Sequence, residues 1–251
     1  MSDEQAREEI LVNVTSGEVR AALLENGVLQ EVYVERAGRR GVISNIYLGK
    51  VSRVLPGMQA AFIDIGLERT AFLHASDIAR GNAVNVSEDD LPSIRDLVRE
   101  GDDLLVQVVK DPLGNKGARL TTFITLPSRH LVLLPKGDSV GISARIEDED
   151  ERERLRQMVE GLLEARGLAC GAIVRTVAEG AESAALEADL KYLVKLWDVL
   201  QDRCRNAGVK TLIHEELALP LRVRRDLVTI DVDHILGDSA PESEALTACA
   251  G

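Results

Sequence analysis

The sequence predicts an α+β fold with more than one domain, and three observations support this prediction. Apolar and polar residues alternate in short runs between residues 9 and 124, which is typical of antiparallel strands with one buried face. Apolar residues recur at helical spacing in residues 148–166 and 184–206. A chain of 251 residues is also long enough for two or three small domains.

The first strands are predicted in residues 9–35, as three runs joined by two tight turns. The runs read EILVNVTS, GEVRAALLEN and GVLQEVYVER. Gly17 stands at the first turn and Asn26-Gly27 at the second. Because Asn-Gly between alternating runs is the strongest short-range hairpin signal, we expect these strands to be connected as hairpins.

Residues 43–78 are the most informative part of the chain. The alternation breaks twice, each time at glycine, which predicts several short antiparallel strands. Phe62 and Phe72 then fall on neighbouring strands, with Lys50 and Arg53 on the strand before them. A small β-barrel with aromatic rings and cations on one face can stack nucleic-acid bases. The segment therefore predicts a nucleic-acid-binding surface.

The barrel-like region continues to about residue 124. It contains a polar excursion at residues 79–92, an acidic helical piece at residues 96–100 and a final strand, LLVQVVKD. Strand-like runs follow at residues 126–135 and 171–176. The second of these runs leads into a loop that contains glycine, a residue that tolerates tight turns.

The two amphipathic helices alternate with these last strands, and further elements follow them. TLIHEE, a shorter helix at residues 219–228 and the strand-like VDHILGD come next. The closing residues, PESEALTACAG, read as the start of another helix that stops. We interpret this ending as the mark of a fragment of a longer protein.

The charge is unevenly distributed along the chain. The net charge is -12, whereas a nucleic-acid binder usually carries a basic field. Acidic residues concentrate at 88–90, 100–103 and 147–151, and every charged residue between positions 36 and 56 is basic. Because salt screens charges beyond roughly 8 Å under physiological conditions, a locally basic face can still bind RNA. We expect this binding to be weak and sensitive to salt.

Cysteine usage and the N-terminus indicate the compartment. Cys170, Cys204 and Cys249 are odd in number and widely spaced, which fits a reducing compartment and excludes a local zinc knuckle. The charged N-terminus has no apolar core, so a secretory signal is not expected. No run approaches the roughly 18 apolar residues of a membrane span. We therefore expect a soluble, cytoplasmic protein.

Several motifs occur in a distinctive order. After the hairpin segment come GVISNIYLGKVSRVLPGMQAAFIDIGLERTAFLH, GNKGARLTTFITL, LVLLP, GISARIE, IVRTVAEGA and a helix that ends in KLW. No single motif is decisive, but their order and spacing cover nearly the whole chain. On these residues the sequence resembles the bacterial ribonuclease E/G endoribonucleases.

The resemblance implies an S1 RNA-binding barrel of the oligonucleotide-binding type in residues 43–125. The barrel would be inserted in an RNase H-like subdomain made of residues 1–42 and 215–251, the second part being incomplete. Residues 126–214 would form a mixed α/β 5′-sensor domain. The implied function is the RNA-binding, 5′-monophosphate-sensing half of a single-strand endoribonuclease that acts in rRNA processing and mRNA decay.

Three barrel residues match the family's RNA contacts. Phe62 and Phe72 match the aromatic residues on which bases stack, although a phenylalanine in a small barrel can instead belong to its interior. Lys116, in the GNKG loop, matches a lysine that contacts RNA phosphate, and its alternative is a plain solvated turn.

Five residues fall on positions of the family's 5′-phosphate pocket. Arg175 and Thr176 suit this role because a phosphate monoester is bound well by a planar guanidinium, a hydroxyl and backbone N–H groups. Without its context an Arg-Thr pair would be an ordinary strand end. The other three positions are Arg145, Val132 and Ser128.

Two positions depart from the family pattern. Ser128 stands where well-known members carry Gly, and we expect it to be tolerated because the contact there uses the backbone. Ala144 stands beside Arg145 where a second Arg occurs, and its loss is expected to weaken phosphate affinity.

The resemblance places no catalytic or metal-binding residue in this chain. In the family, two aspartates hold magnesium for attack on the phosphodiester, and a CxxC pair shares zinc between subunits. Both lie beyond Gly251. Asp231 and Asp233 resemble the catalytic motif superficially, but the preceding LPLRVRRDLV aligns them with a structural segment. His214 and His234 lack a partner at ligand spacing, so structural roles are expected.

Single-stranded RNA with a 5′-monophosphate is the expected partner, and no membrane is expected. Because family members assemble partly through the missing C-terminal region, a homo-oligomer is expected only where that region is present. One alternative stays open: a stand-alone RNA-binding or regulatory protein that lacks nuclease activity. The continuation of the reading frame would distinguish the two.

Overall fold

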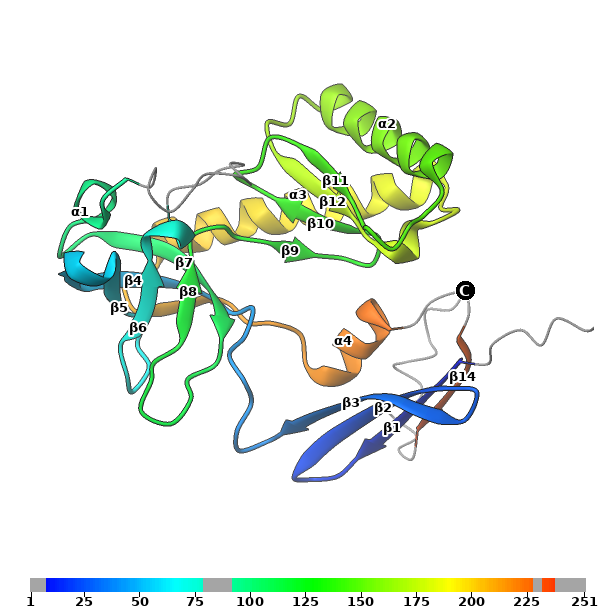
Figure 1. Ribbon diagram of the computed structural model, residues 1–251, viewed down its shortest axis with the longest axis horizontal. Helices are drawn as coiled ribbons and strands as arrows, with labels where there is room; N and C mark the ends of the chain where they lie inside the picture. The colour runs from blue at the N-terminus through cyan, green and yellow to red at the C-terminus, as the bar shows by residue number, and fades with distance from the viewer. Residues whose placement is uncertain (1–7, 79–91, 228–231, 238–251) are drawn as a thin grey trace, which may run out of the picture. The chain divides into compact units, whose positions relative to one another are not determined.

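The computed structural model describes residues 8–78, 92–227 and 232–237 (Figure 1). The chain divides into two compact units, Met1–Gly41 with Leu217–Gly251 and Val42–Glu216. The fold is mixed α+β with several sheets, as the sequence predicts. Within the described residues, no helix combines the length and apolar character that crossing a membrane demands.

The first unit is a four-stranded sheet in the order β14-β1-β2-β3. Its strands are β1 (Glu8–Val14), β2 (Glu18–Glu25), β3 (Val28–Arg36) and β14 (Val232–Gly237). The predicted hairpins are confirmed, and Asn26 and Gly27 adopt φ angles of 51° and 75° at the second turn. Strand β14 pairs with β1 in parallel.

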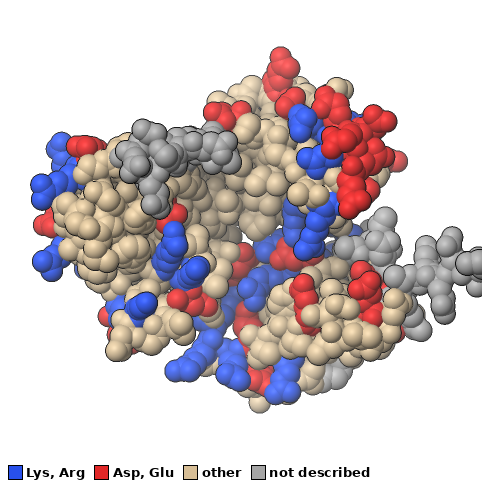
Figure 2. All heavy atoms as spheres, in the orientation of Figure 1, with Lys and Arg blue, Asp and Glu red and all other residues tan. Residues whose placement is uncertain are grey.

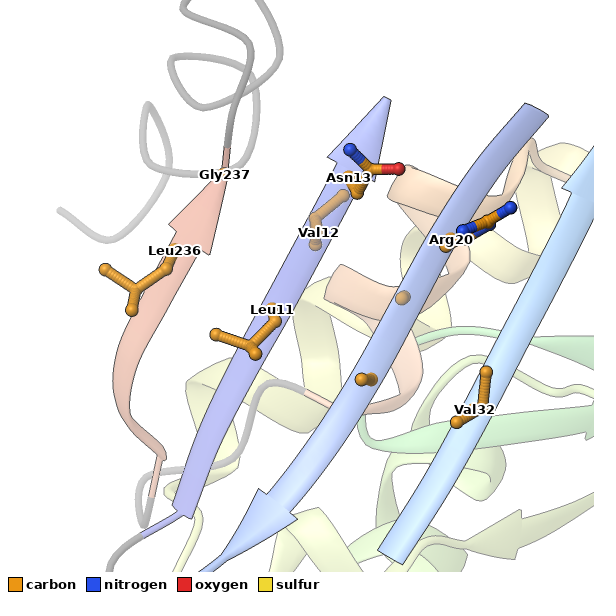
Figure 3. Close-up of a pocket in the computed structure, with 9 residues that line it drawn as sticks. Leu11, Val12, Asn13, Arg20, Val32, Leu236 and Gly237 are labelled. Carbon is orange, nitrogen blue, oxygen red and sulfur yellow. The ribbon is translucent and has the colours of Figure 1, made fainter. Parts of the chain in front are cut away.

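One face of this sheet packs against helix α4 (Leu219–Asp226), through a small core centred on Ile10 and Val12. The opposite face carries an apolar row across the four strands. Leu11 pairs in register with Leu236 and Ala22, and Ala22 pairs with Val32. These side chains line a shallow hollow of about 420 Å³ (Figure 3).

The second unit begins with a closed five-stranded barrel, which is OB-like in form. Its strands follow the order β4-β5-β6-β8-β7, and β7 pairs again with β4. They are β4 (Ile46–Leu55), β5 (Ala60–Asp64), β6 (Ala71–His74), β7 (Asp103–Lys110) and β8 (Arg119–Thr121). Val51, Ile63, Leu73, Val106 and Leu120 fill the interior.

Two further elements attach to the barrel. Helix α1 (Ile94–Leu97) is capped by the hydroxyl of Ser93, and it begins earlier than the acidic piece that the sequence predicts. Strand β13 (Thr211–His214) pairs with the first residues of β4, from Ile46 to Leu48. The chain thus returns to the barrel sheet after a long excursion (Figure 1).

Between β8 and β13 the chain forms a second sheet with two helices. The sheet order is β11 (Val140–Ile142), β12 (Gly171–Val174), β10 (Leu131–Leu134) and β9 (Leu126–Pro127). Helices α2 (Glu149–Ala165) and α3 (Ser183–Asn206) confirm the two amphipathic helices that the sequence predicts. Their buried leucines share one core with alternate residues of β10 and β12. The other face of the sheet therefore remains open around Val132 and Ile173.

Candidate nucleic-acid interface

A row of cations and aromatic rings runs across the barrel strands. Arg53 is paired in register with Phe62, Phe62 with Phe72, and Phe72 with Arg119. Arg119 is also the partner of Lys110 on the next strand. Because cross-strand neighbours point to the same face of a sheet, these five side chains form one continuous outer stripe, which we call the barrel row.

The two phenylalanines lie outside the core of the barrel. Their ring centroids are 6.4 Å apart at an interplanar angle of 68°, an edge-to-face arrangement. The residues next to them in sequence, Ile63 and Leu73, point inward and are fully buried. Both rings are half-buried. Their exposed faces can accept a nucleobase, while the contact with RNA itself stays a prediction.

His74 extends the barrel row by one more ring, which the sequence argument missed. Its ring lies 6.5 Å from that of Phe72 at an angle of 27°. The backbone N–H of Ser76 donates to Nδ1 of His74 at 3.2 Å. Since an amide can only donate, Nδ1 is an acceptor and a neutral ring carries its proton on Nε2. The period-2 alternation from Phe72 could have indicated this position.

The cations around the barrel row differ in their partners. Arg119 donates two hydrogen bonds to Asp77, at 2.9 and 3.2 Å, and Lys50 pairs with Asp103 at 2.9 Å. Among the described residues, no carboxylate pairs with three other exposed cations of the site, which are Arg53, Lys110 and Lys116. These cations are the ones available to neutralise phosphate.

Lys116 lies in a tight loop between β7 and β8. Its backbone exchanges two hydrogen bonds with Leu113, at 2.9 and 3.1 Å. Gly117 follows, and there a Cβ atom would come within 2.0 Å of the Thr70 carbonyl oxygen. The loop is therefore pressed against the turn that precedes β6. This packing restrains the backbone that carries the Lys116 side chain.

A second group of candidate residues meets at the ends of β10 and β12. The guanidinium of Arg175 donates from Nη1 to the carbonyl oxygen of Ser128 at 2.6 Å. The backbone N–H of Arg175 donates to the carbonyl oxygen of His130 at 2.8 Å. The turn between β9 and β10 thus holds Arg175 at both its backbone and its side chain.

Thr176 and Arg145 are brought together through a residue that the sequence argument did not single out. The hydroxyl of Ser143 lies 2.9 Å from that of Thr176 and accepts a hydrogen bond from the Arg145 amide at 3.3 Å. Thr176 and the side chain of Arg145 are exposed. Val132 lies nearby on β10, on the face turned away from the helices. Two hydroxyls, those of Ser143 and Thr176, therefore lie together beside the backbone of Arg145 and next to Arg175 in the chain.

Ser128 is held more tightly than its predicted role requires. Its side chain and backbone are only 6% exposed, and its N–H donates to the Leu131 carbonyl at 2.8 Å. Its hydroxyl lies 2.9 Å from that same carbonyl and 2.7 Å from a carboxylate oxygen of Asp189. Both donors of Ser128 are used inside the fold, and its carbonyl orients Arg175.

The described residues contain no group of three or more His, Cys, Asp and Glu side chains placed to hold a metal ion. Asp231 lies outside these residues, as does Cys249, and the side chain of Asp233 is also not described. Cys170 and Cys204 are free thiols, and burial raises the pKa of both. Neither cysteine therefore has the lowered pKa that activates a thiol for catalysis.

Comparison with known proteins gives a consistent result. Residues 125–250 match the family described as the Ribonuclease E/G family. The chain is 50% identical to Ribonuclease G of Escherichia coli strain K12 over 242 residues, which cover 95% of this chain and 49% of that protein. It is 50% identical to Ribonuclease G of Haemophilus influenzae over 235 residues, or 92% and 47% of the two chains.

A more distant match has a different name. Ribonuclease E of Escherichia coli strain K12 is 38% identical over 233 residues, which cover 92% of this chain and 22% of that protein. The chain spans about half the length of the Ribonuclease G proteins that it matches.

Proposed function

The chain belongs to the ribonuclease E/G family, and from this membership we propose that it is the RNA-binding and 5′-monophosphate-sensing half of a single-strand endoribonuclease. Its substrates would be cytoplasmic transcripts in rRNA processing and mRNA decay. The barrel would be the S1 RNA-binding domain, in residues 43–125, and residues 126–214 would be the 5′-sensor. The remaining residues, 1–42 and 215–251, would form part of an RNase H-like subdomain.

The observation that carries this proposal is the barrel row. Two half-buried phenylalanine rings, Phe62 and Phe72, lie in register between Arg53 and Arg119. Aromatic faces flanked by cations bind single-stranded nucleic acid through base stacking and phosphate contacts. Lys116 would add a further phosphate contact from its loop. The division of the chain at Gly41 and Leu217 supports an inserted barrel and sensor.

The second group of residues supports recognition of the RNA 5′ end. Arg175 would provide a charge-assisted hydrogen bond to a terminal phosphate. Thr176 would add a hydroxyl, and Arg145 a second cation. Val132 and Ser128 would shape the site from β10 and from the preceding turn.

The barrel row is tested with a short A/U-rich single-stranded RNA and fluorescence anisotropy. We expect Phe62→Ala and Phe72→Ala each to weaken binding by about 1–3 kcal/mol, the range for losing one stacked base. The matched control is Tyr192→Ala, which removes an aromatic ring that is 57% exposed on α3. Unchanged affinity in both phenylalanine variants would overturn the assignment of the barrel as the RNA-binding surface.

A further inference from the structure

Asp189, on helix α3, connects that helix to the turn between β9 and β10. Its Oδ2 atom lies 2.7 Å from the hydroxyl oxygen of Ser128 and accepts a hydrogen bond from the backbone N–H of His130, also at 2.7 Å. Nδ1 of His130 lies 3.3 Å from the same oxygen. One carboxylate therefore contacts two residues of the three-residue turn, Ser128 and His130.

The same two residues, Ser128 and His130, also accept hydrogen bonds from Arg175. The Ser128 carbonyl accepts from the Arg175 guanidinium at 2.6 Å, and the His130 carbonyl accepts from the Arg175 amide at 2.8 Å. The hydrogen bonds form a continuous path from Asp189 through the turn to Arg175.

We propose that Asp189 is a positioning residue for 5′-phosphate recognition, which acts through Ser128 and His130 to set the orientation of Arg175. This inference rests on the proposed sensing function. A free arginine side chain samples many rotamers, and one that is already oriented loses less freedom when it binds a planar or charged ligand. Asp189 would contribute affinity for the phosphate without touching it.

The charge of Asp189 is compatible with this role. Burial opposes its ionisation, but hydrogen bonds from His130 and Ser128 outweigh burial and hold the pKa of Asp189 below its ordinary value. The carboxylate therefore stays ionised at neutral pH and keeps accepting both hydrogen bonds. The groups that donate to Asp189 belong to Ser128 and His130 in the turn. The same turn contacts the guanidinium of Arg175.

The test compares affinities for one short single-stranded RNA with a 5′-monophosphate or a 5′-hydroxyl. Asp189→Asn keeps the size of the side chain and removes its charge and part of its acceptor capacity. We expect the preference for the monophosphate to fall roughly tenfold, as for outer-shell residues that orient a ligand-binding side chain. Glu187→Gln is the matched control, since Glu187 lies two positions earlier on α3 and pairs with Arg166 instead. It should leave the preference unchanged.

A second arm distinguishes positioning from general loss of structure. In an Arg175→Ala background, Asp189→Asn should cause no further loss of preference, because the residue through which it acts is gone. Ser128→Ala removes the hydroxyl contacts with Asp189 and with the Leu131 backbone but keeps the contact between Asp189 and His130, so it should lower the preference by a smaller factor. This variant supplies the answer if Asp189→Asn does not fold.

The outcomes separate the inference from the function on which it rests. Two outcomes would overturn the positioning role alone. In the first, Asp189→Asn lowers the affinity for both RNA forms equally. In the second, Asp189→Asn and Ser128→Ala leave the preference for the monophosphate intact, while Arg175→Ala abolishes it. A wild-type chain that binds RNA but does not prefer the monophosphate would overturn the sensing function, and the positioning role with it.

Discussion

Single residues at both candidate sites are oriented by the fold before any ligand binds. Arg119 is held beside Phe72 by Asp77, and Arg175 is held by the Ser128 carbonyl. Side chains that are already ordered lose less entropy on binding. Arg175 was singled out through the family resemblance, because an Arg-Thr pair without that context would be an ordinary strand end. The contact with Ser128 could not be predicted, because it joins positions 47 residues apart in the chain.

Thr176 is expected to contribute directly to phosphate binding. Its hydroxyl lies 2.9 Å from that of Ser143, so it is oriented while the residue itself stays exposed. Thr176→Val keeps the branched shape and removes the hydroxyl. Since a hydrogen bond to a charged group contributes about 1.5–3 kcal/mol, we expect affinity for 5′-monophosphorylated RNA to fall about tenfold or more. Binding of the 5′-hydroxyl form should not change.

The control for this measurement is Thr211→Val, an exposed threonine on β13. The same loss for Thr176→Val and Thr211→Val would contradict a specific role for Thr176.

The lowered pKa of Asp189 predicts an acid-sensitive contribution to folding. Because its pKa in the folded state lies below the ordinary value of 3.8, this contribution is complete above the pKa of the unfolded chain. It is lost as the pH falls through the folded-state pKa. Urea unfolding measures this contribution at pH 7 and at pH 3. The free energies of unfolding of the wild type and of Asp189→Asn should differ less at pH 3 than at pH 7. A difference in the free energy of unfolding that is larger at pH 3 than at pH 7 would contradict this contribution of the Asp189 carboxylate.

At the scale of elements, local sequence signals predicted most strands and helices. Asn26-Gly27 forms the expected turn, and both amphipathic helices form where apolar residues recur at helical spacing. The run at residues 126–135 forms two strands instead of one, because residues 128–130 make the turn that Asp189 holds. Pairing of β13 with β4 is also not predictable from local pattern, since it depends on a partner far along the chain.

The loop that carries Lys116 is expected to depend on Gly117. In Gly117→Ala the added Cβ would clash with the Thr70 carbonyl oxygen. Because neither is the end of a flexible side chain, the two loops must separate. We expect a loss of about 1–3 kcal/mol in the free energy of unfolding, measured by urea denaturation, together with weaker RNA binding.

Gly57→Ala is the control for this prediction, because no atom lies within 4 Å of the position of its added Cβ. An equal effect of Gly57→Ala and Gly117→Ala would show that the close approach to Thr70 does not restrict the loop.

At the scale of the whole molecule, an acidic chain carries local cationic sites. The net charge is -12, and Figure 2 shows acidic side chains gathered over α2. The barrel row lies on other elements, with Arg53 and Lys110 at its two ends. Overall composition therefore could not predict the proposed RNA-binding face, whereas strand register brings its cations together. The family was predictable from the order of the motifs along the chain.

Salt dependence tests whether these local cations contact phosphate. If Arg53, Lys110 and Lys116 each neutralise one phosphate, log affinity should fall linearly with log salt concentration with a slope of about −2. Lys116→Ala should make the slope shallower by about 0.7. The slope is measured by fluorescence anisotropy titrations at several salt concentrations, from low to moderate. A slope near zero would contradict phosphate contact by the barrel.

The most direct test of the account is the affinity of one short single-stranded RNA in two forms, at fixed moderate salt. We expect the 5′-monophosphate form to bind more tightly than the 5′-hydroxyl form, and Arg175→Ala to remove the difference while leaving the weaker binding that the barrel provides. Equal binding of the two forms by the wild-type chain would contradict the sensing of the RNA 5′ end, and no binding of either form would contradict the RNA-binding function itself.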